Sequence, residues 1–587
     1  MSNQLLTDYF RLHIANQFKE SITEVANSVY YVFAGRSTPF ANGDVVTAPE
    51  NTVNEYDIGS QDNMLFGKRV QAEDVSVVIP RYDWTANTVY TAYRADVDLS
   101  DKRYFACVNS AAQYHVFKVL DNNGGAPSTV APALEDTSAD DEYYATSDGY
   151  VWKYMYTIPK TLYDKFATKD FIPVVVNANV VANAVPGAID VVEITYPGSH
   201  FNSYTNGAFT VTDLRVGGNP RVLNIANTAS GTDGYYEGCY IYLTSGTGQG
   251  QYRRIDQYNV AGTQKLITIN EAFTVSPDVT TTYEINPAVT ITGDGSGAAA
   301  RAVINAEQAN SVKRVEILDR GSNYTWASAN LVSQTDGFSN TSLLTPVMSP
   351  RNGHGSDPEA ELQGTNIGIS VTFANTEGNT IPTVNDYRTI GILKDPQYAN
   401  VTLFFDSVDG LFEIGESLYQ QSTRAEGIVI ATDETSYVTI SNVVGVFASS
   451  ANLVGYTSNA TANVSSFEIN GSSKGFDTFD QRVKLTYSAP SVVSFAEDEM
   501  IYQLDPAVSN AVFHSIDDNY IYLTNLRGSV NTGAQIIGSN SGAFATLLSK
   551  YAGDLIHGSG EVLYIENTDP VTRSNTQSEV IKIVLKF

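Results

Sequence analysis

Lysine and arginine are scarce in this sequence. Its 587 residues include 35 of them against 64 aspartates and glutamates, which gives a formal net charge of −29 at pH 7. Binding to nucleic acid or to an anionic lipid surface needs an excess of cations on one face, so we expect no nucleic acid and no membrane among the partners. The composition is nevertheless that of a folded protein, because only 17% of the residues are charged and 42% are hydrophobic.

Cysteine and long hydrophobic runs are scarce as well. Cys107 and Cys239 lie far apart in apolar runs, which favours two buried free thiols and excludes a disulfide framework. No Cys/His spacing suits zinc, and we expect no metal and no cofactor. No run reaches the ~20 apolar residues of a membrane span, and the first residues lack the pattern of a signal peptide. We therefore expect a soluble protein that is made in a cytosol.

One helix and many short strands account for most of the hydrophobic pattern. Over residues 5–28, apolar side chains recur every three or four positions, which predicts an amphipathic helix. After it, runs rich in Val, Ile, Tyr and Thr alternate with Gly/Asn/Asp/Ser turns, as in the strands predicted at 28–34, 75–79, 114–120 and 150–158. The residues of the helical stripe are Leu6, Phe10, His13, Ile14, Phe18, Ile22 and Val25.

A tandem repeat occupies the later part of the chain. Ten residues recur 83 positions further on without a gap, so the sequence predicts two copies of one β module. Among them, Glu416 and Glu499 stand at predicted strand starts, and we interpret them as charges on a strand edge. The pairs are Phe412/Phe495, Glu416/Glu499, Tyr419/Tyr502, Gln420/Gln503, Tyr437/Tyr520, Asn442/Asn525, Gly445/Gly528, Gly455/Gly538, Ala460/Ala543 and Ala462/Ala545.

The sequence therefore predicts a mainly β, multidomain protein with a small α+β part. It would consist of antiparallel β-sandwich-like modules, one N-terminal helix and the tandem β repeat within a long insertion. We expect an N-terminal α+β domain at 1–180, a first β insertion at 181–345 and a connecting segment with strands at 346–411. The tandem β modules would occupy 412–553, and the strands of 554–587 would return to the N-terminal domain.

Three segments have the outline of a binding site, and each has a simpler explanation. Residues 293–298 fit G-x-G-x-x-A and are followed by Asp319, as in a dinucleotide-binding βαβ unit. The helix that this unit needs, at 299–308, is very short, so we favour a glycine-rich β turn. The loop around His354, at 352–359, and the acidic loop at 135–142 have side chains that bind metal ions, but polar loops need no metal.

Four phrases, three toward the N-terminal end and one at the C-terminal end, resemble a known family. As a set they are similar to the baseplate wedge subunit made by gene eight of T4-like contractile-tailed bacteriophages. The resemblance covers residues 20–180 and 555–587, and the β repeats between them look like an insertion. The phrases are Gly35-Arg36-Ser37-Thr38-Pro39, then Val78-Ile79-Pro80-Arg81-Tyr82-Asp83-Trp84, then Asp148-Gly149-Tyr150-Val151-Trp152-Lys153-Tyr154 with Ile158-Pro159, and finally Gly560-Glu561-Val562-Leu563-Tyr564-Ile565-Glu566-Asn567 with Pro570 and an alternating terminal strand.

The resemblance implies a structural protein of the virion. Such a protein is a homodimer in the tail baseplate that links neighbouring wedge proteins during assembly and on host contact. It is made and assembled in the cytoplasm of the bacterial host. It is not an enzyme, and it has no catalytic residues, no cofactor and no small-molecule substrate. Contacts that the family makes through its middle domains do not carry over to the insertion.

Four residues of the shared phrases are candidate structural or interface anchors. Arg36 and Arg81 are cations in an arginine-poor chain, each near a proline. A guanidinium can clamp a carboxylate within the fold or across an interface, and we favour pairing within the fold. Trp84 and Trp152 can either pack in the core or anchor an interface, and we favour the core.

Two other function classes stay open, a carbohydrate-binding adhesin and a polysaccharide depolymerase on a β scaffold. Both predict a concave groove lined by acidic and aromatic side chains. A wedge subunit instead predicts that the two ends of the chain pack into one domain. It also predicts no buried pair of acids about 5–10 Å apart.

Overall fold

The computed structural model describes residues 6–24, 28–43, 45–110, 113–134, 143–210, 216–331, 342–375, 382–469, 475–503, 509–574 and 576–587. It is 49% strand and 10% helix, which confirms the mainly β, multidomain fold. The chain forms two compact units, one of Met1–Val78 with Thr365–Phe587 and one of Ile79–Gly364. The expected domain at 1–180 is therefore divided between them. No helix of the described residues is long and apolar enough to cross a membrane.

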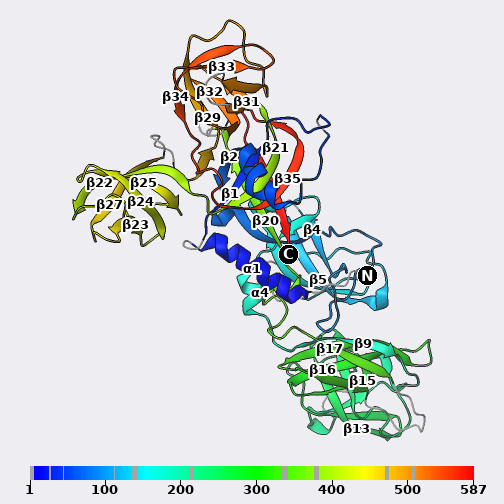
Figure 1. Cartoon of the computed structure of the whole chain (residues 1–587). Coiled ribbons are helices and arrows are strands. Elements are labelled where there is room, and N and C mark those ends of the chain that lie inside the picture. The colour runs from blue at the N-terminus through cyan, green and yellow to red at the C-terminus, as the bar shows by residue number, and fades with distance from the viewer. Residues whose placement is uncertain are drawn as a thin grey trace. The chain divides into compact units, whose positions relative to one another are not determined.

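The first unit has a body in which the two ends of the chain interleave (Figure 1). One sheet has the order β28-β2-β1-β21-β35, and a second contains β36-β20-β3. Their bounds are β28 (Thr478–Asp480), β2 (Met64–Arg69), β1 (Tyr30–Gly35), β21 (Asp386–Lys394), β35 (Glu561–Thr572), β36 (Glu579–Lys586), β20 (Asn366–Phe373) and β3 (Val75–Pro80). All residues of β1 are buried, because β1 has a continuous apolar sequence and neighbours on both edges.

Helix α1 (Asp8–Thr23) is the predicted N-terminal helix, and the Thr7 hydroxyl caps it by accepting a hydrogen bond from the Phe10 N–H. The predicted apolar stripe is only partly correct. Leu12 and Ala15 are buried, whereas Leu6, Phe10 and His13 are exposed. The helical period alone could not show that Leu12 and Ala15, outside the predicted stripe, are the residues that pack against the rest of the protein. Val25 lies outside the described residues.

The tandem modules are two closed six-stranded antiparallel barrels, which corrects the sandwich-like form expected for them (Figure 1). Alternation of side chains is the same in a sandwich and in a barrel, and closure depends on pairing between the first and last strands. Barrel 1 consists of β22 (Tyr398–Asp409), β23 (Ser417–Gln420), β24 (Ala425–Thr432), β25 (Tyr437–Val444), β26 (Asn452–Gly455) and β27 (Thr461–Ile469). Barrel 2 consists of β29 (Val483–Ser488), β30 (Met500–Gln503), β31 (Ser509–Ile516), β32 (Tyr520–Arg527), β33 (Gln535–Gly538) and β34 (Phe544–Tyr551).

The strand bounds confirm the repeat. Strands β23, β25 and β26 begin and end 83 residues before β30, β32 and β33. Each barrel also includes a strand that precedes the ten identities, since β22 begins at Tyr398, within the segment expected to be a connection.

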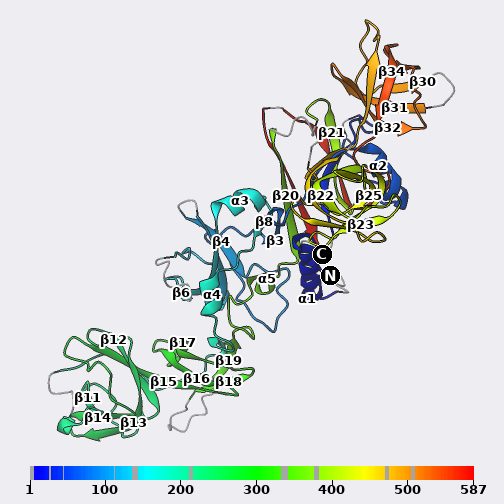
Figure 2. The same ribbon diagram turned by 90° about the vertical axis from the view of Figure 1, so that its left-hand side faces the viewer.

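The second unit contains a four-stranded sheet and a β insertion. The sheet has the order β4-β5-β7-β6, and the insertion at 189–348 forms two hydrophobic cores. Figure 2 shows the strands of this insertion in two groups, β11–β14 and β15–β19. The bounds are β4 (Phe105–Ser110), β5 (Gln113–Asn122), β6 (Tyr143–Ala145), β7 (Tyr150–Ile158) and, in the insertion, β9 (Ile189–Tyr196), β10 (Tyr204–Ala208), β11 (Val222–Ile225), β12 (Cys239–Ser245), β13 (Tyr252–Ala261), β14 (Gln264–Ile269), β15 (Thr282–Gly293), β16 (Ser296–Asn305), β17 (Ser311–Ser322), β18 (Ala327–Leu331) and β19 (Leu343–Met348).

Short elements complete the fold. They are α2 (Ser60–Asn63), α3 (Lys160–Phe166), β8 (Phe171–Pro173), α4 (Ala178–Ala182) and α5 (Pro358–Glu361). The segment that could have been a dinucleotide-binding helix is strand β16, paired with β15 and β17. The turn interpretation of residues 293–298 is therefore confirmed.

Candidate functional site

Arg81 makes its carboxylate pair within the fold. Its Nε donates to the two carboxylate oxygens of Asp83 over 3.0 and 2.9 Å, and its Nη1 donates to the Thr168 carbonyl over 3.2 Å. The hydrogen bonds that it donates to Asp83 raise the pKa of Arg81 above its usual value. The guanidinium thus ties the loop after β3 to the end of α3.

Arg36 lies in a different environment. Its Nε and Nη2 donate to the carbonyls of Thr38 and Pro39 over 3.3 and 3.4 Å, and its guanidinium lies 4.7 Å from the centre of the Phe40 ring. Burial lowers the pKa of Arg36. This cation therefore braces its own loop through carbonyl oxygens.

Both candidate tryptophans belong to the core of the second unit. Trp152 is fully buried, stacked on Tyr150 and edge-on to Tyr90. Trp84 packs against the same cluster, and its Nε1 donates to the Ser128 hydroxyl over 3.2 Å. The structure therefore places Trp152 away from any surface.

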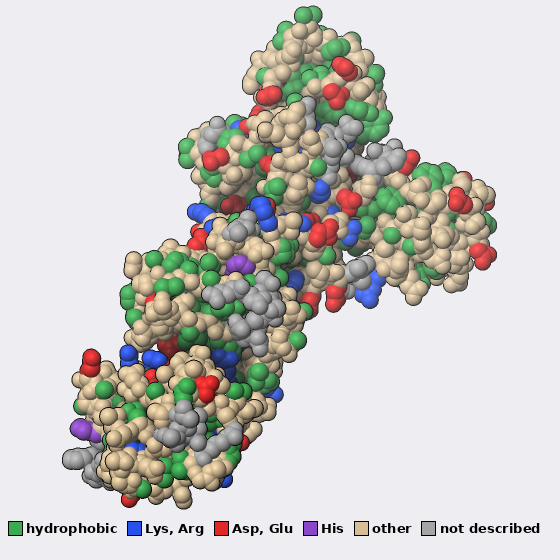
Figure 3. Space-filling model, turned by 180° about the vertical axis from the view of Figure 1, so that it is seen from behind, with side chains coloured by type: hydrophobic (Ala, Val, Ile, Leu, Met, Phe, Trp, Pro, Cys, Tyr) green, Lys and Arg blue, Asp and Glu red, His purple; other side chains and the backbone are tan. Residues whose placement is uncertain are grey.

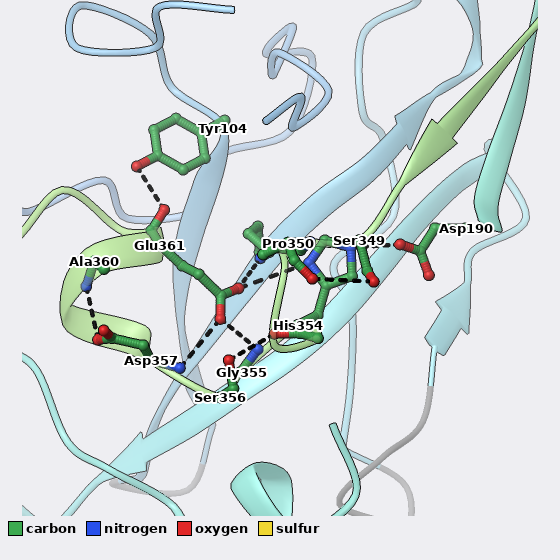
Figure 4. A network of polar contacts seen from close by, with 12 residues as sticks. Tyr104, Asp190, Ser349, Pro350, His354, Gly355, Ser356, Asp357, Ala360 and Glu361 are labelled. Carbon is green, nitrogen blue, oxygen red and sulfur yellow. Dashed lines mark hydrogen bonds and ion pairs between the residues drawn. The ribbon is translucent and has the colours of Figure 1, made fainter. Parts of the chain in front are cut away.

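The His354 loop contributes to a buried polar network in the second unit (Figure 4). His354 Nε2 lies 2.6 Å from Asp190 Oδ2, and Nδ1 lies 3.7 Å from Glu361 Oε2. Lys118 on β5 forms an ion pair with Glu361, and the Tyr143 hydroxyl donates to Asp190 over 3.0 Å. Strands β5, β6 and β9 and helix α5 are joined in this way.

Backbone groups complete the network. Glu361 Oε1 accepts hydrogen bonds from the N–H groups of Gly355 and Asp357 over 2.7 and 3.4 Å. Gly355 adopts a φ of 84°, in the left-handed region that favours glycine, and a Cβ there would overlap Val180. The Asp357 side chain caps α5 by accepting from the Ala360 N–H over 3.0 Å.

The electrostatics of the network favour the charged form of Glu361. Burial raises the pKa of Glu361, but Lys118 and His354 outweigh burial and hold it at about 2. Burial lowers the pKa of Lys118, and Glu361 opposes that shift. Burial and Asp190 raise the pKa of Tyr143, which therefore stays a neutral hydrogen-bond donor.

This network is closed to substrates. The side chains of Lys118, His354 and Glu361 are at most 4% exposed. Among the described residues no group of three or more His, Cys, Asp or Glu side chains is arranged to hold a metal ion. The acidic loop at 135–142 lies outside those residues. The network acts chemically as a set of buried ion pairs, in which the loss of one partner leaves an uncompensated charge.

Two buried acids therefore do lie close together, separated by one imidazole ring, contrary to what we expected for a wedge subunit. The sequence marked the loop of His354 as polar but gave no signal for Asp190 or Lys118, which belong to strands far away along the chain. Only the pairing of β9 and β5 with their neighbours brings those side chains to the loop.

Two clefts in the second unit are open to solvent. One of about 610 Å³ contains Arg94, Asp96, Tyr324 and Arg351, and Asp96 is paired with Arg94 over 2.9 Å. The other, of about 510 Å³, is lined by Asp121 and Glu193 but by no aromatic side chain. Burial raises the pKa of Asp121, and Glu193 is paired with Arg94 over 2.6 Å.

The carboxylates repeated in the two barrels are buried, so their interpretation as edge charges was wrong. Glu416 accepts hydrogen bonds from the N–H groups of Glu413, Thr457 and Ser458 over 2.7, 3.0 and 3.0 Å. Glu499 accepts equivalent bonds from Ala496, Asn540 and Ser541 over 2.8, 2.9 and 2.9 Å. Burial raises the pKa of both acids, but these donors hold it below the usual value. Each carboxylate joins two loops at one end of its barrel.

Other repeated residues support the loops at both ends of each barrel. Gly455 and Gly538 are glycines because a Cβ would overlap the carboxylates of Glu416 and Glu499. The amide of Gln420 both donates to and accepts from the backbone of Ala448, over 2.9 and 2.7 Å, and Gln503 repeats this with Asn531. The identities between the copies thus preserve structure and add no catalytic group.

Neither a protein-family model nor a curated protein matches this sequence.

Proposed function

We propose that this protein is a structural subunit of the baseplate wedge in a T4-like contractile tail. It would act as a homodimer that binds neighbouring wedge proteins, without turnover. The observation that carries the proposal is the composite body of the first unit. Strand β1, next to the first phrase of the resemblance, and β35, which contains the last phrase, both pair with β21. The resemblance implied such a domain, built from both ends of the chain.

The chemistry of the polar sites also supports a binding role. The buried acids Asp190 and Glu361 are paired with Lys118, His354 and Tyr143, and their side chains are at most 4% exposed. The net charge of −29 favours a free subunit that stays dissolved until it meets partners with basic or apolar surfaces.

Imaging of intact particles tests the proposal. A label on this chain should lie in a six-fold ring around the tail tube, at the baseplate, and nowhere else on the virion. Location at the tips of fibres would contradict the wedge role.

A polysaccharide depolymerase is the second candidate, and it would act in the cleft with Asp121 and Glu193, which has the expected acids but not the expected aromatic side chains. Burial favours the protonated form of Asp121, as in a general acid, beside a second carboxylate. The purified chain on a lawn of host cells tests this directly. Halos that disappear with Asp121→Asn would establish the enzyme, and the absence of halos supports the wedge role.

A further inference from the structure

One end of barrel 1 has exposed apolar side chains that are not part of the barrel core. The chain enters this barrel at Tyr398 and leaves it at Ile469, and both residues lie at the same end. The opposite end, which we call the free end, consists of the loops β22–β23, β24–β25 and β26–β27. Ile414, 71% exposed, lies on the first of these loops, with Leu411, and Tyr456 lies on the third.

The free end of barrel 1 is held in one conformation. Phe412 between the exposed residues is buried in the barrel core. The Glu416 carboxylate accepts from the N–H of Glu413 on the first loop and from that of Thr457 on the third, which joins the two loops. Apolar side chains on a preorganised surface lose little conformational entropy when a partner covers them, so this arrangement suits binding.

The exposed acids of barrel 1 are concentrated at its free end. That end carries five of them, whereas the other end carries Glu426, Glu468 and Arg424, the sole lysine or arginine of residues 398–469. A like-charged partner is therefore excluded by repulsion, and a basic one is attracted. The five acids are Asp406, Asp409, Glu413, Asp433 and Glu434.

Barrel 2 repeats both features with different residues. Its free end carries Val493, Ile516 and the fully exposed Val492. Figure 3 shows hydrophobic and acidic side chains on the surfaces of both barrels. The residues at the free end differ between the two barrels, but both ends are apolar and acidic. The two copies therefore share the chemical character of this end and not its residues. The exposed acids at this end are Glu497, Asp517 and Asp518, whereas Asp498 accepts a hydrogen bond from Asn385, outside the barrel, over 3.2 Å. The cations Lys484, Arg527 and Lys550 lie at the other end.

We infer that the free ends of the two barrels are paired docking surfaces for a protein partner whose own surface offers apolar pockets surrounded by lysine and arginine. The inference rests on the proposed binding role, and it names the chemistry of the partner. A second copy of this chain would bring acids against acids at these ends. The two surfaces belong to one chain, so a partner with two such sites gains affinity through effective concentration.

The test uses the full chain and two synthetic peptides of 16 residues. In one, lysine alternates with leucine, and in the other, lysine alternates with serine, which separates the apolar contribution from charge alone. Calorimetry should show that the lysine–leucine peptide binds at least tenfold more tightly. Equal binding of the two peptides would overturn the inference, because it would show attraction to bulk charge only.

Matched variants locate the site. Neutralising four acids of the free end of barrel 1 should weaken binding of the lysine–leucine peptide severalfold, whereas neutralising four exposed acids elsewhere should change it less than twofold. If the free-end and control variants weaken peptide binding equally, the proposed location is refuted. It is also refuted if the free end binds calcium and not the peptide. The free-end variant is Asp406→Asn, Asp409→Asn, Glu413→Gln and Glu434→Gln, and the control is Asp57→Asn, Glu73→Gln, Glu307→Gln and Asp569→Asn.

The two proposals fail separately. If particle imaging places the chain outside the baseplate while the variants still locate the peptide on the barrels, the docking inference stands and the wedge role does not. If the chain lies in the baseplate and the free-end variant binds normally, the wedge role stands and the docking inference is refuted.

Discussion

Replacing Glu416 by glutamine should destabilise barrel 1 and leave barrel 2 unchanged. The carboxylate accepts three backbone N–H bonds of 2.7 to 3.0 Å and the Ser458 hydroxyl at 2.8 Å, all at one buried site. Glutamine offers one carbonyl oxygen and an NH₂ group that cannot accept, so at least one buried N–H loses its acceptor. Each such loss costs about 1–3 kcal/mol, and the weaker hydrogen bonds of a neutral acceptor add to it. We expect a loss of about 2–4 kcal/mol in the free energy of unfolding of barrel 1.

Hydrogen exchange followed by mass spectrometry of the full chain measures this loss barrel by barrel. A loss of about 3 kcal/mol should accelerate exchange of the most protected amides of β24 and β25 by roughly a hundredfold. The mirror variant, Glu499→Gln, should accelerate β31 and β32 instead. Glu426→Gln is the matched control, since it makes the same chemical change at an exposed position of β24.

Two results would refute the reasoning. If Glu416→Gln exchanges no faster than Glu426→Gln, the buried carboxylate does not hold the two loops. If it accelerates both barrels equally, the repeats do not unfold as separate units.

Three further predictions concern the network, acid stability and assembly. Lys118→Met should destabilise the second unit by about 3–5 kcal/mol in urea unfolding. Adding Glu361→Gln should restore part of that loss, because the double variant removes both charges. If the double variant restores no stability, the ion pair is contradicted. Burial lowers the pKa of His514 to about 3, so its neutral form is favoured in the fold and the stability it contributes is lost as pH falls below the unfolded pKa of about 6.5. Between pH 6.5 and 4.5 this loss is about 2 kcal/mol, and His514→Gln should show a correspondingly shallower fall of the melting temperature, whereas an identical fall would contradict it. Sedimentation of the purified chain should give twice the mass of the 63.6 kDa monomer, and a monomer at micromolar concentration would argue against the homodimer.

The sequence by itself determined the local features of this protein. Alternation of apolar and polar residues located β3, β5 and β7 to within a residue or two, and the offset of 83 residues located equivalent strands in two modules. Residues 299–308 are too few for the helix of a nucleotide-binding unit, so the sequence already argued against that unit. These features depend on near neighbours along the chain, and a period of two or a repeat can be recognised without knowing what the segment packs against.

Tertiary structure decided everything that depends on distant partners. Alternation shows which face of a strand is buried but not which strand lies beside it, so the closure of the barrels and the pairing of β1 and β35 with β21 could not be predicted. For the same reason the helix buried Leu12 and not Phe10, and Glu416, expected on an edge, became a buried acceptor. Lys118, Asp190 and Glu361 meet because strands β5 and β9 converge on helix α5. The energy of a buried charge depends on that convergence and not on sequence spacing.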